Sequence, residues 1–191
     1  MGEDGFLFRG EEEKVRNKRI LRLVYAAVCL TLAMLLPLIT GQIRAVGNAL
    51  CPMHIPVLLC GYLCGPVWGA AVGIIAPLLR SALWGMPVLF PNAVGMAVEL
   101  ACYGAIAGAL YRRFPHRIAG VYGSLLTAMV GGRVAWGLAR FAIARLTGMS
   151  FPLSAFWVGA VGGAVPGILL QILLVPPIVL ALRRSGTLLI D

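Results

Sequence analysis

The segment HIPVLLCGYLCGPVWGAAVGIIAPLLRSALWGMP, residues 54–87, decides how many times the chain crosses a membrane. It is apolar, but it is longer than one spanning helix of about 20 residues and shorter than two generous ones. Gly65-Pro66 interrupts it, because proline lacks an amide hydrogen and disfavours helix in the residue before it. The sequence therefore predicts a short helix over about 54–64 and a second helix over about 66–83.

On either side of this segment, apolar stretches fill almost the whole chain. Of the 191 residues, 60% are hydrophobic and 12% are charged, and the mean hydropathy is +0.93. So few charged residues cannot cover a water-exposed surface. The other predicted helices cover about 18–39, 92–111, 118–144 and 153–182, the last interrupted around Gly162-Gly163, Pro166 and Pro176-Pro177. The predicted fold is an all-α membrane protein, a compact bundle of six transmembrane helices.

The basic residues test that number of spans. The net charge is +9, and lysine and arginine gather in residues 14–22, in the loop 112–117 and at Arg183-Arg184. Six spans place all three groups on one side, which the positive-inside rule identifies as the cytoplasm; five would put the 112–117 loop outside. We therefore expect cytoplasmic N- and C-termini, with tails at 1–17 and 184–191 around a membrane domain at 18–183.

Several functional classes have no support in the sequence. Basic residues do not alternate with aromatic ones, so the charge does not indicate nucleic-acid binding. The five cysteines lack the spacing of a metal site. The chain has no HExxH, GxSxG or phosphate-binding GxxxxGK[ST] pattern. We expect no enzyme, no ATP hydrolysis by this chain, and no resident metal or cofactor.

Glycines recur at intervals of four residues within the decisive segment, at Gly61, Gly65, Gly69 and Gly73. Small residues at this spacing let helix backbones approach closely in lipid. Two interpretations follow: the glycines pack the helices of this chain together, or they dock the chain onto a partner membrane subunit.

Charged side chains inside the predicted spans indicate a polar interior, because a charge in the bilayer usually faces a cavity or a partner. One face of the helix at 92–111 carries Asn92, Met96, Glu99 and Tyr103. Arg133 and Arg140 are seven residues apart and share a face of the next helix with Trp136. Either Glu99 pairs with one arginine and joins two helices, or the polar face lines a ligand pocket; the two interpretations are compatible.

Four further residues are candidates for binding. Arg80 and Trp84 lie near a helix end, where they can anchor the helix at the membrane interface or hold an anionic organic molecule. His54 stands at a helix start and Gln171 lies in the last helix. For both, the alternative to a ligand is a hydrogen bond that serves packing.

Three ordered blocks in residues 53–66 and 73–108 carry a family resemblance: MHIPVLLCGYLCGP, then the APLLRSALWGMPVLFP and MAVELACYG portions. They resemble the substrate-binding S components of energy-coupling factor (ECF) transporters, in the branch with riboflavin- and pantothenate-type members. The resemblance implies a six-helix protein of the bacterial plasma membrane that binds a vitamin. It also implies a coupling transmembrane subunit and two cytoplasmic ATPase subunits as partners.

The resemblance implies a pocket near the outer face, built from the loop at residues 42–53 and from the last three helices. Its residues would be Asn92, Glu99, Tyr103, Arg133, Trp136, Arg140 and Gln171, with His54, Arg80, Met86 and Pro87 at its mouth. The arginines favour an anion such as pantothenate, whereas the tryptophans suit riboflavin or a benzimidazole-type compound. Two alternatives come from other functional classes. The chain would be a structural or regulatory membrane subunit without a ligand, or a channel.

Overall fold

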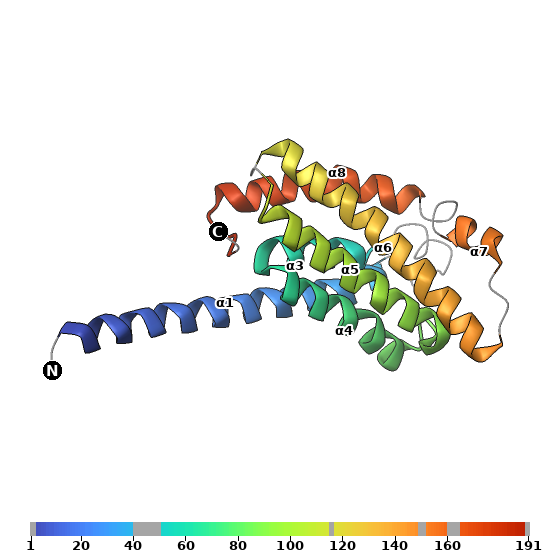
Figure 1. The fold of residues 1–191 in the computed structure, drawn as a ribbon, viewed down its shortest axis with the longest axis horizontal. Helices are drawn as coiled ribbons and strands as arrows, with labels where there is room; N and C mark the ends of the chain where they lie inside the picture. Colours follow the sequence, from blue (N-terminus) through green and yellow to red (C-terminus); the bar gives the residue numbers. More distant parts are fainter. Residues whose placement is uncertain (1–2, 40–50, 115–116, 149–151, 160–164, 190–191) are drawn as a thin grey trace.

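The computed structural model describes residues 3–39, 51–114, 117–148, 152–159 and 165–189 (Figure 1). All regular structure within these ranges is helical, so the predicted all-α class is confirmed. The elements are α1 (Glu3–Ile39), α3 (His54–Cys64), α4 (Pro66–Trp84), the π-helical turn η1 (Leu89–Ala93), α5 (Val94–Tyr111), α6 (Ile118–Thr147), α7 (Leu153–Trp157) and α8 (Val165–Arg184).

The predicted break at Gly65-Pro66 is present. Helix α3 ends at Cys64, and α4 begins at Pro66, where the missing amide hydrogen removes no helical hydrogen bond. Gly65 has a φ of +99°, a conformation that side chains disfavour. The chain therefore turns sharply between two helices, as the sequence predicts.

Six apolar helices are present among the described residues, as predicted, but one of them, α3, is shorter than a full span. Its 11 residues rise only about 16 Å, roughly half of a hydrocarbon core of about 30 Å. The other five long apolar helices have the length and composition to cross a membrane: Val15–Ile39, Pro66–Trp84, Leu89–Tyr111, Ile118–Thr147 and Val165–Arg184. The break produces two helices, but the first one begins part of the way through the bundle.

Two predicted boundaries also differ. Helix α1 ends at Ile39 as expected, but it begins at Glu3 instead of near residue 18, because its charged N-terminal part is rich in strong helix formers. In Figure 1 this part of α1 extends beyond the other helices. The last predicted helix is present as α7 and α8. The predicted interruptions at Pro166 and Pro176-Pro177 are absent, because α8 continues through these prolines, which helices in membranes tolerate. The predicted interruption at Gly162-Gly163 lies outside the described residues.

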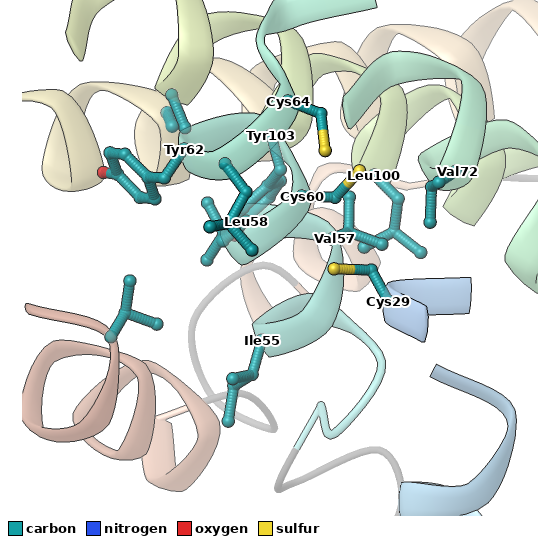
Figure 2. Packing of buried hydrophobic residues seen from close by; sticks show 14 of the residues in the cluster. Cys29, Ile55, Val57, Leu58, Cys60, Tyr62, Cys64, Val72, Leu100 and Tyr103 are labelled. Atoms are coloured by element: carbon teal, nitrogen blue, oxygen red, sulfur yellow. The ribbon is translucent and has the colours of Figure 1, made fainter. Parts of the chain in front are cut away.

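The core is centred on α3. Every residue of this helix except Leu59 is buried, and Figure 2 shows its side chains surrounded by those of neighbouring helices. The thiol groups of Cys29, Cys60 and Cys64 are part of this cluster. Since these cysteines are free thiols packed among aliphatic side chains, they behave as small hydrophobic residues.

Glycines bring α3, α4 and α5 into backbone contact. A Cβ added to Gly61 would lie 2.5 Å from the carbonyl oxygen of Gly104, and one added to Gly69 would lie 2.7 Å from the Cα of Gly61. A Cβ on Gly73 would meet the backbone of Leu100 at 2.5 Å. These glycines pack the helices of this chain together, which supports the first of the two interpretations from the sequence.

The three basic groups meet at one end of the molecule. Arg19 and Arg22 line a hollow together with Arg112, which follows the last residue of α5. Arg117 lines a second hollow with Arg183 and Arg184. The C-terminal segment folds back onto the same end, where Arg22 donates a hydrogen bond of 2.7 Å to the carbonyl oxygen of Leu189. We refer to this as the basic end.

Candidate functional site

An ion pair joins α5 to α6 in the interior of the bundle. An Nη1 hydrogen of Arg133 is directed to Oε1 of Glu99 at an N···O distance of 3.0 Å, and the two side chains are 14% and 3% exposed. Gly132 makes this approach possible, because a Cβ there would clash with the Tyr103 ring and lie 3.1 Å from the backbone oxygen of Glu99. The expected pairing of Glu99 with an arginine is therefore present.

His54 adds a second partner for the same carboxylate oxygen. Its Nε2 lies 3.3 Å from Oε1 of Glu99. Since an ionised carboxylate only accepts hydrogen bonds, Nε2 carries the hydrogen. The imidazole is 2% exposed and meets the Tyr103 ring edge-on, with ring centroids 5.1 Å apart. Among the described residues, Nδ1 of His54 has no hydrogen-bond partner.

Cys51 completes this group, which we call the inner cluster: Cys51, His54, Glu99, Tyr103 and Arg133. Nη2 of Arg133 lies 3.8 Å from the Cys51 sulfur. Burial raises the pKa of the Cys51 thiol, and the charge of Arg133 opposes that increase. Cys51 was not among the individual candidates from the sequence; only its place in the 42–53 loop pointed to it.

A second group of side chains lies near the start of α5 and the end of α6. We call it the outer cluster: Asn92, Trp136, Arg140 and Phe156. Nη1 of Arg140 donates a hydrogen bond of 3.0 Å to Oδ1 of Asn92. Gly95 packs against both Arg140 and Trp136, since a Cβ there would lie 3.0 Å and 3.5 Å from them. The Trp136 ring stacks on Phe156 of α7 with centroids 6.2 Å apart. Sequence reasoning missed Phe156, because nothing in a five-residue helix indicates its position.

The two clusters are arranged as successive layers. Asn92 in η1 and Glu99 in α5 are seven residues apart, as are Arg133 and Arg140 in α6. Seven residues correspond to about 10 Å of helical rise. Helix α5 ends at the basic end and α6 begins at it. The outer layer, near the start of α5 and the end of α6, is therefore further from the basic end than the inner layer.

Arg80 and Trp84 form a separate site on α4. Nη1 of Arg80 donates to the carbonyl oxygen of Met34 at 3.4 Å, and the guanidinium lies 5.7 Å from the centroid of the Trp84 ring. The Arg80 residue is 5% exposed. No described contact joins this pair to the inner or the outer cluster.

Met96 and Gln171 have simpler surroundings. Met96 is partly buried and packs against the hydrophobic core. Gln171 on α8 is fully buried, and neither of its amide atoms has a hydrogen-bond partner among the described residues. The predicted loop contribution from residues 42–50 lies outside the described residues.

Comparison with known proteins adds one finding to this geometry. The sequence model for the ECF transporter, substrate-specific component, matches residues 21–179. The matched range includes every residue of the inner and outer clusters. A search of curated proteins and a search of solved structures gave no match.

Proposed function

This chain belongs to the family of ECF transporter substrate-specific components, and on that premise we propose which ligand it binds and where. As a member it is a multi-pass membrane protein and a non-catalytic, substrate-binding subunit. Membership of this family implies that the chain acts together with an ECF module, which comprises a transmembrane component and ATPases. We propose that its substrate is a small carboxylate vitamin, with pantothenate as the first candidate, bound between the inner and outer clusters.

The observation that carries this proposal is the buried inner cluster. A charged pair inside a membrane bundle is costly unless it serves a cavity or a partner. This pair also has a histidine on the same carboxylate oxygen. On α8, the buried Gln171 has an amide group whose atoms lack hydrogen-bond partners among the described residues. Such groups suit the hydroxyl and amide functions of a polar ligand.

The position of the carboxylate follows from charge. Glu99 neutralises Arg133 in the inner cluster, so this layer does not favour a second anion. Arg140 in the outer cluster donates a hydrogen bond to the amide oxygen of Asn92. A guanidinium has five N–H donors and binds a carboxylate through parallel hydrogen bonds, so it can hold a ligand beside its protein partners. We assign the carboxylate of the ligand to Arg140 and its uncharged polar groups to the inner cluster.

We also propose an orientation in the membrane from the position of the basic end. By the positive-inside rule, this end and both termini would lie on the cytoplasmic side of a bacterial plasma membrane. The outer cluster then lies nearer the external face, from which a nutrient arrives. The tails at 1–17 and 184–191 would flank the membrane domain on the cytoplasmic side.

A different ligand is favoured by one observation. The stacked Trp136 and Phe156 rings offer an aromatic surface beside Arg140, which would suit riboflavin or a benzimidazole-type compound. A structural or regulatory subunit without a ligand would instead use the Glu99–Arg133 pair only to join helices.

Calorimetry on the purified protein with a vitamin panel tests the proposal. We expect submicromolar binding of pantothenate and much weaker binding of riboflavin and benzimidazole compounds. Arg140→Ala should weaken binding about 10- to 100-fold, as expected for the loss of a charge-assisted contact. Arg145→Ala is the matched control, since Arg145 lies on the same helix and is exposed.

Three results would contradict the proposal. Tight binding of riboflavin and of no other vitamin would show that the ligand is riboflavin instead of pantothenate. Unchanged pantothenate binding in Arg140→Ala would contradict the assignment of the ligand carboxylate to Arg140. Absence of any binding in a folded protein, with Glu99→Ala and Arg133→Ala affecting only folding, would favour the structural subunit.

A further inference from the structure

The hollow at the basic end combines positive charge with an apolar wall. It measures about 610 Å³ and lies between α1, the α3–α4 junction and the end of α5. Arg19, Arg22 and Arg112 supply the charge, and Leu23, Val67 and Trp68 supply apolar surface. None of the described residues that line the hollow is acidic. The vitamin site proposed between the inner and outer clusters does not include this hollow.

The arginines are placed by the local backbone. Gly65 leaves space for Arg112, because a Cβ at this position would lie 2.6 Å from Nη2 of Arg112. Arg22 donates through Nη2 to Leu189, while its buried Nε has no hydrogen-bond partner among the described residues. The backbone oxygen of Arg22 accepts a weak contact from the Cys64 thiol, which ties α1 to α3 at this point. This contact joins α1, which carries two of the arginines, to the end of α3 beside Gly65, against which Arg112 packs.

The apolar wall faces outward. Val67 is 77% exposed and Leu23 is 56% exposed, although both lie in helices that are apolar enough to span a membrane. The candidate span Pro66–Trp84 starts at this hollow, and the span Leu89–Tyr111 ends one residue before Arg112. The hollow is therefore at the level where hydrocarbon meets the headgroups.

We propose that this hollow binds the phosphate group of an anionic phospholipid, with an acyl chain against Leu23 and Val67. Guanidinium groups bind phosphate through charge-assisted hydrogen bonds, and basic pockets between membrane helices favour anionic headgroups. Free phosphate would use the arginines and leave the exposed aliphatic wall unused. An acidic segment of a partner protein would likewise gain little from aliphatic side chains at this level.

Native mass spectrometry of the purified protein with phosphatidylglycerol or phosphatidylcholine tests this proposal. We expect phosphatidylglycerol to remain bound and phosphatidylcholine to dissociate. Arg19→Gln/Arg112→Gln should weaken phosphatidylglycerol binding roughly 30-fold, from about 1 kcal/mol per basic residue. Lys18→Gln/Arg113→Gln is the matched control, because it removes the same charge from adjacent exposed residues outside the hollow. The control should bind nearly as well as the unchanged protein.

The outcomes that overturn the proposal are distinct from one another. Equal loss in both double variants would indicate general surface charge. Displacement of the lipid by millimolar inorganic phosphate would indicate a site for free phosphate. Unchanged lipid binding, with assembly onto the ECF module lost only in Arg19→Gln/Arg112→Gln, would assign the hollow to a protein partner. Vitamin binding is measured in parallel and should not change, so this test does not depend on the identity of the vitamin.

Discussion

Arg133→Met should lower the free energy of unfolding by about 3–5 kcal/mol, the range for removing one partner of a buried ion pair. The substitution leaves the Glu99 carboxylate, which is 3% exposed, with the His54 imidazole as its remaining side-chain partner among the described residues. For a chain of this length the loss corresponds to a fall of roughly 10 °C in the melting temperature. Thermal unfolding in detergent measures it directly.

Two comparisons separate this effect from a general intolerance of α6. Arg145→Met makes the same change on the same helix at an exposed position and should leave the melting temperature within about 1 °C. Arg133→Met/Glu99→Leu removes both charges and should recover most of the stability, because an apolar pair of similar volume often replaces a buried ion pair without loss. If the double variant is no more stable than Arg133→Met, the broken ion pair is not the cause of the lower stability.

Gly104→Ala should prevent α4 and α5 from packing and cost more than about 3 kcal/mol, at the upper end of overpacking effects. The added methyl group would lie against the carbonyl group of Gly69 and 2.8 Å from its Cα. No rotamer change can relieve a contact with backbone atoms, so the two helices must separate. We expect a large loss of folded protein after purification, measured by size-exclusion chromatography and thermal unfolding.

Gly123→Ala is the matched control for this substitution. Gly123 is also in the interior of a helix, but a Cβ there would meet only the Phe114 ring, at 3.8 Å. That distance is ordinary van der Waals contact, and alanine is the better helix former. The control should be neutral or stabilising. Similar losses in both variants would show that the close contact at Gly104 is not decisive.

The fold was largely predictable because proline and glycine act locally. The break at Gly65-Pro66 and the end of α1 at Ile39 follow from residues next to each other in the chain. The short helix at 54–64 was predicted at its observed length but counted as a full span, because hydropathy does not reveal that its 11 apolar residues are surrounded by helices of the same chain instead of lipid. An interruption of the last helix was predicted around Gly162-Gly163, and these residues, between α7 and α8, lie outside the described ranges.

The candidate site was predictable where a helix repeat relates its residues. The seven-residue spacings of Asn92 with Glu99, and of Arg133 with Arg140, indicated two polar faces, and these faces meet in the structure. The contact between Cys51 and Arg133 joins residues 82 positions apart, so no local pattern could reveal it. Arg80 was grouped with the pocket, but its described partners are Met34 and Trp84.

The glycine contacts between α3, α4 and α5 have a consequence for motion. Where backbone lies directly on backbone, there are no side chains whose rearrangement could absorb a shear between the helices. These three helices should therefore move as one block. Among the described helices, an opening that admits a ligand to the inner cluster would come from displacement of α1, α6, α7 or α8 relative to that block. Spectroscopic labels on α4 and α5 would keep their separation through such a change, while labels on α5 and α6 would not.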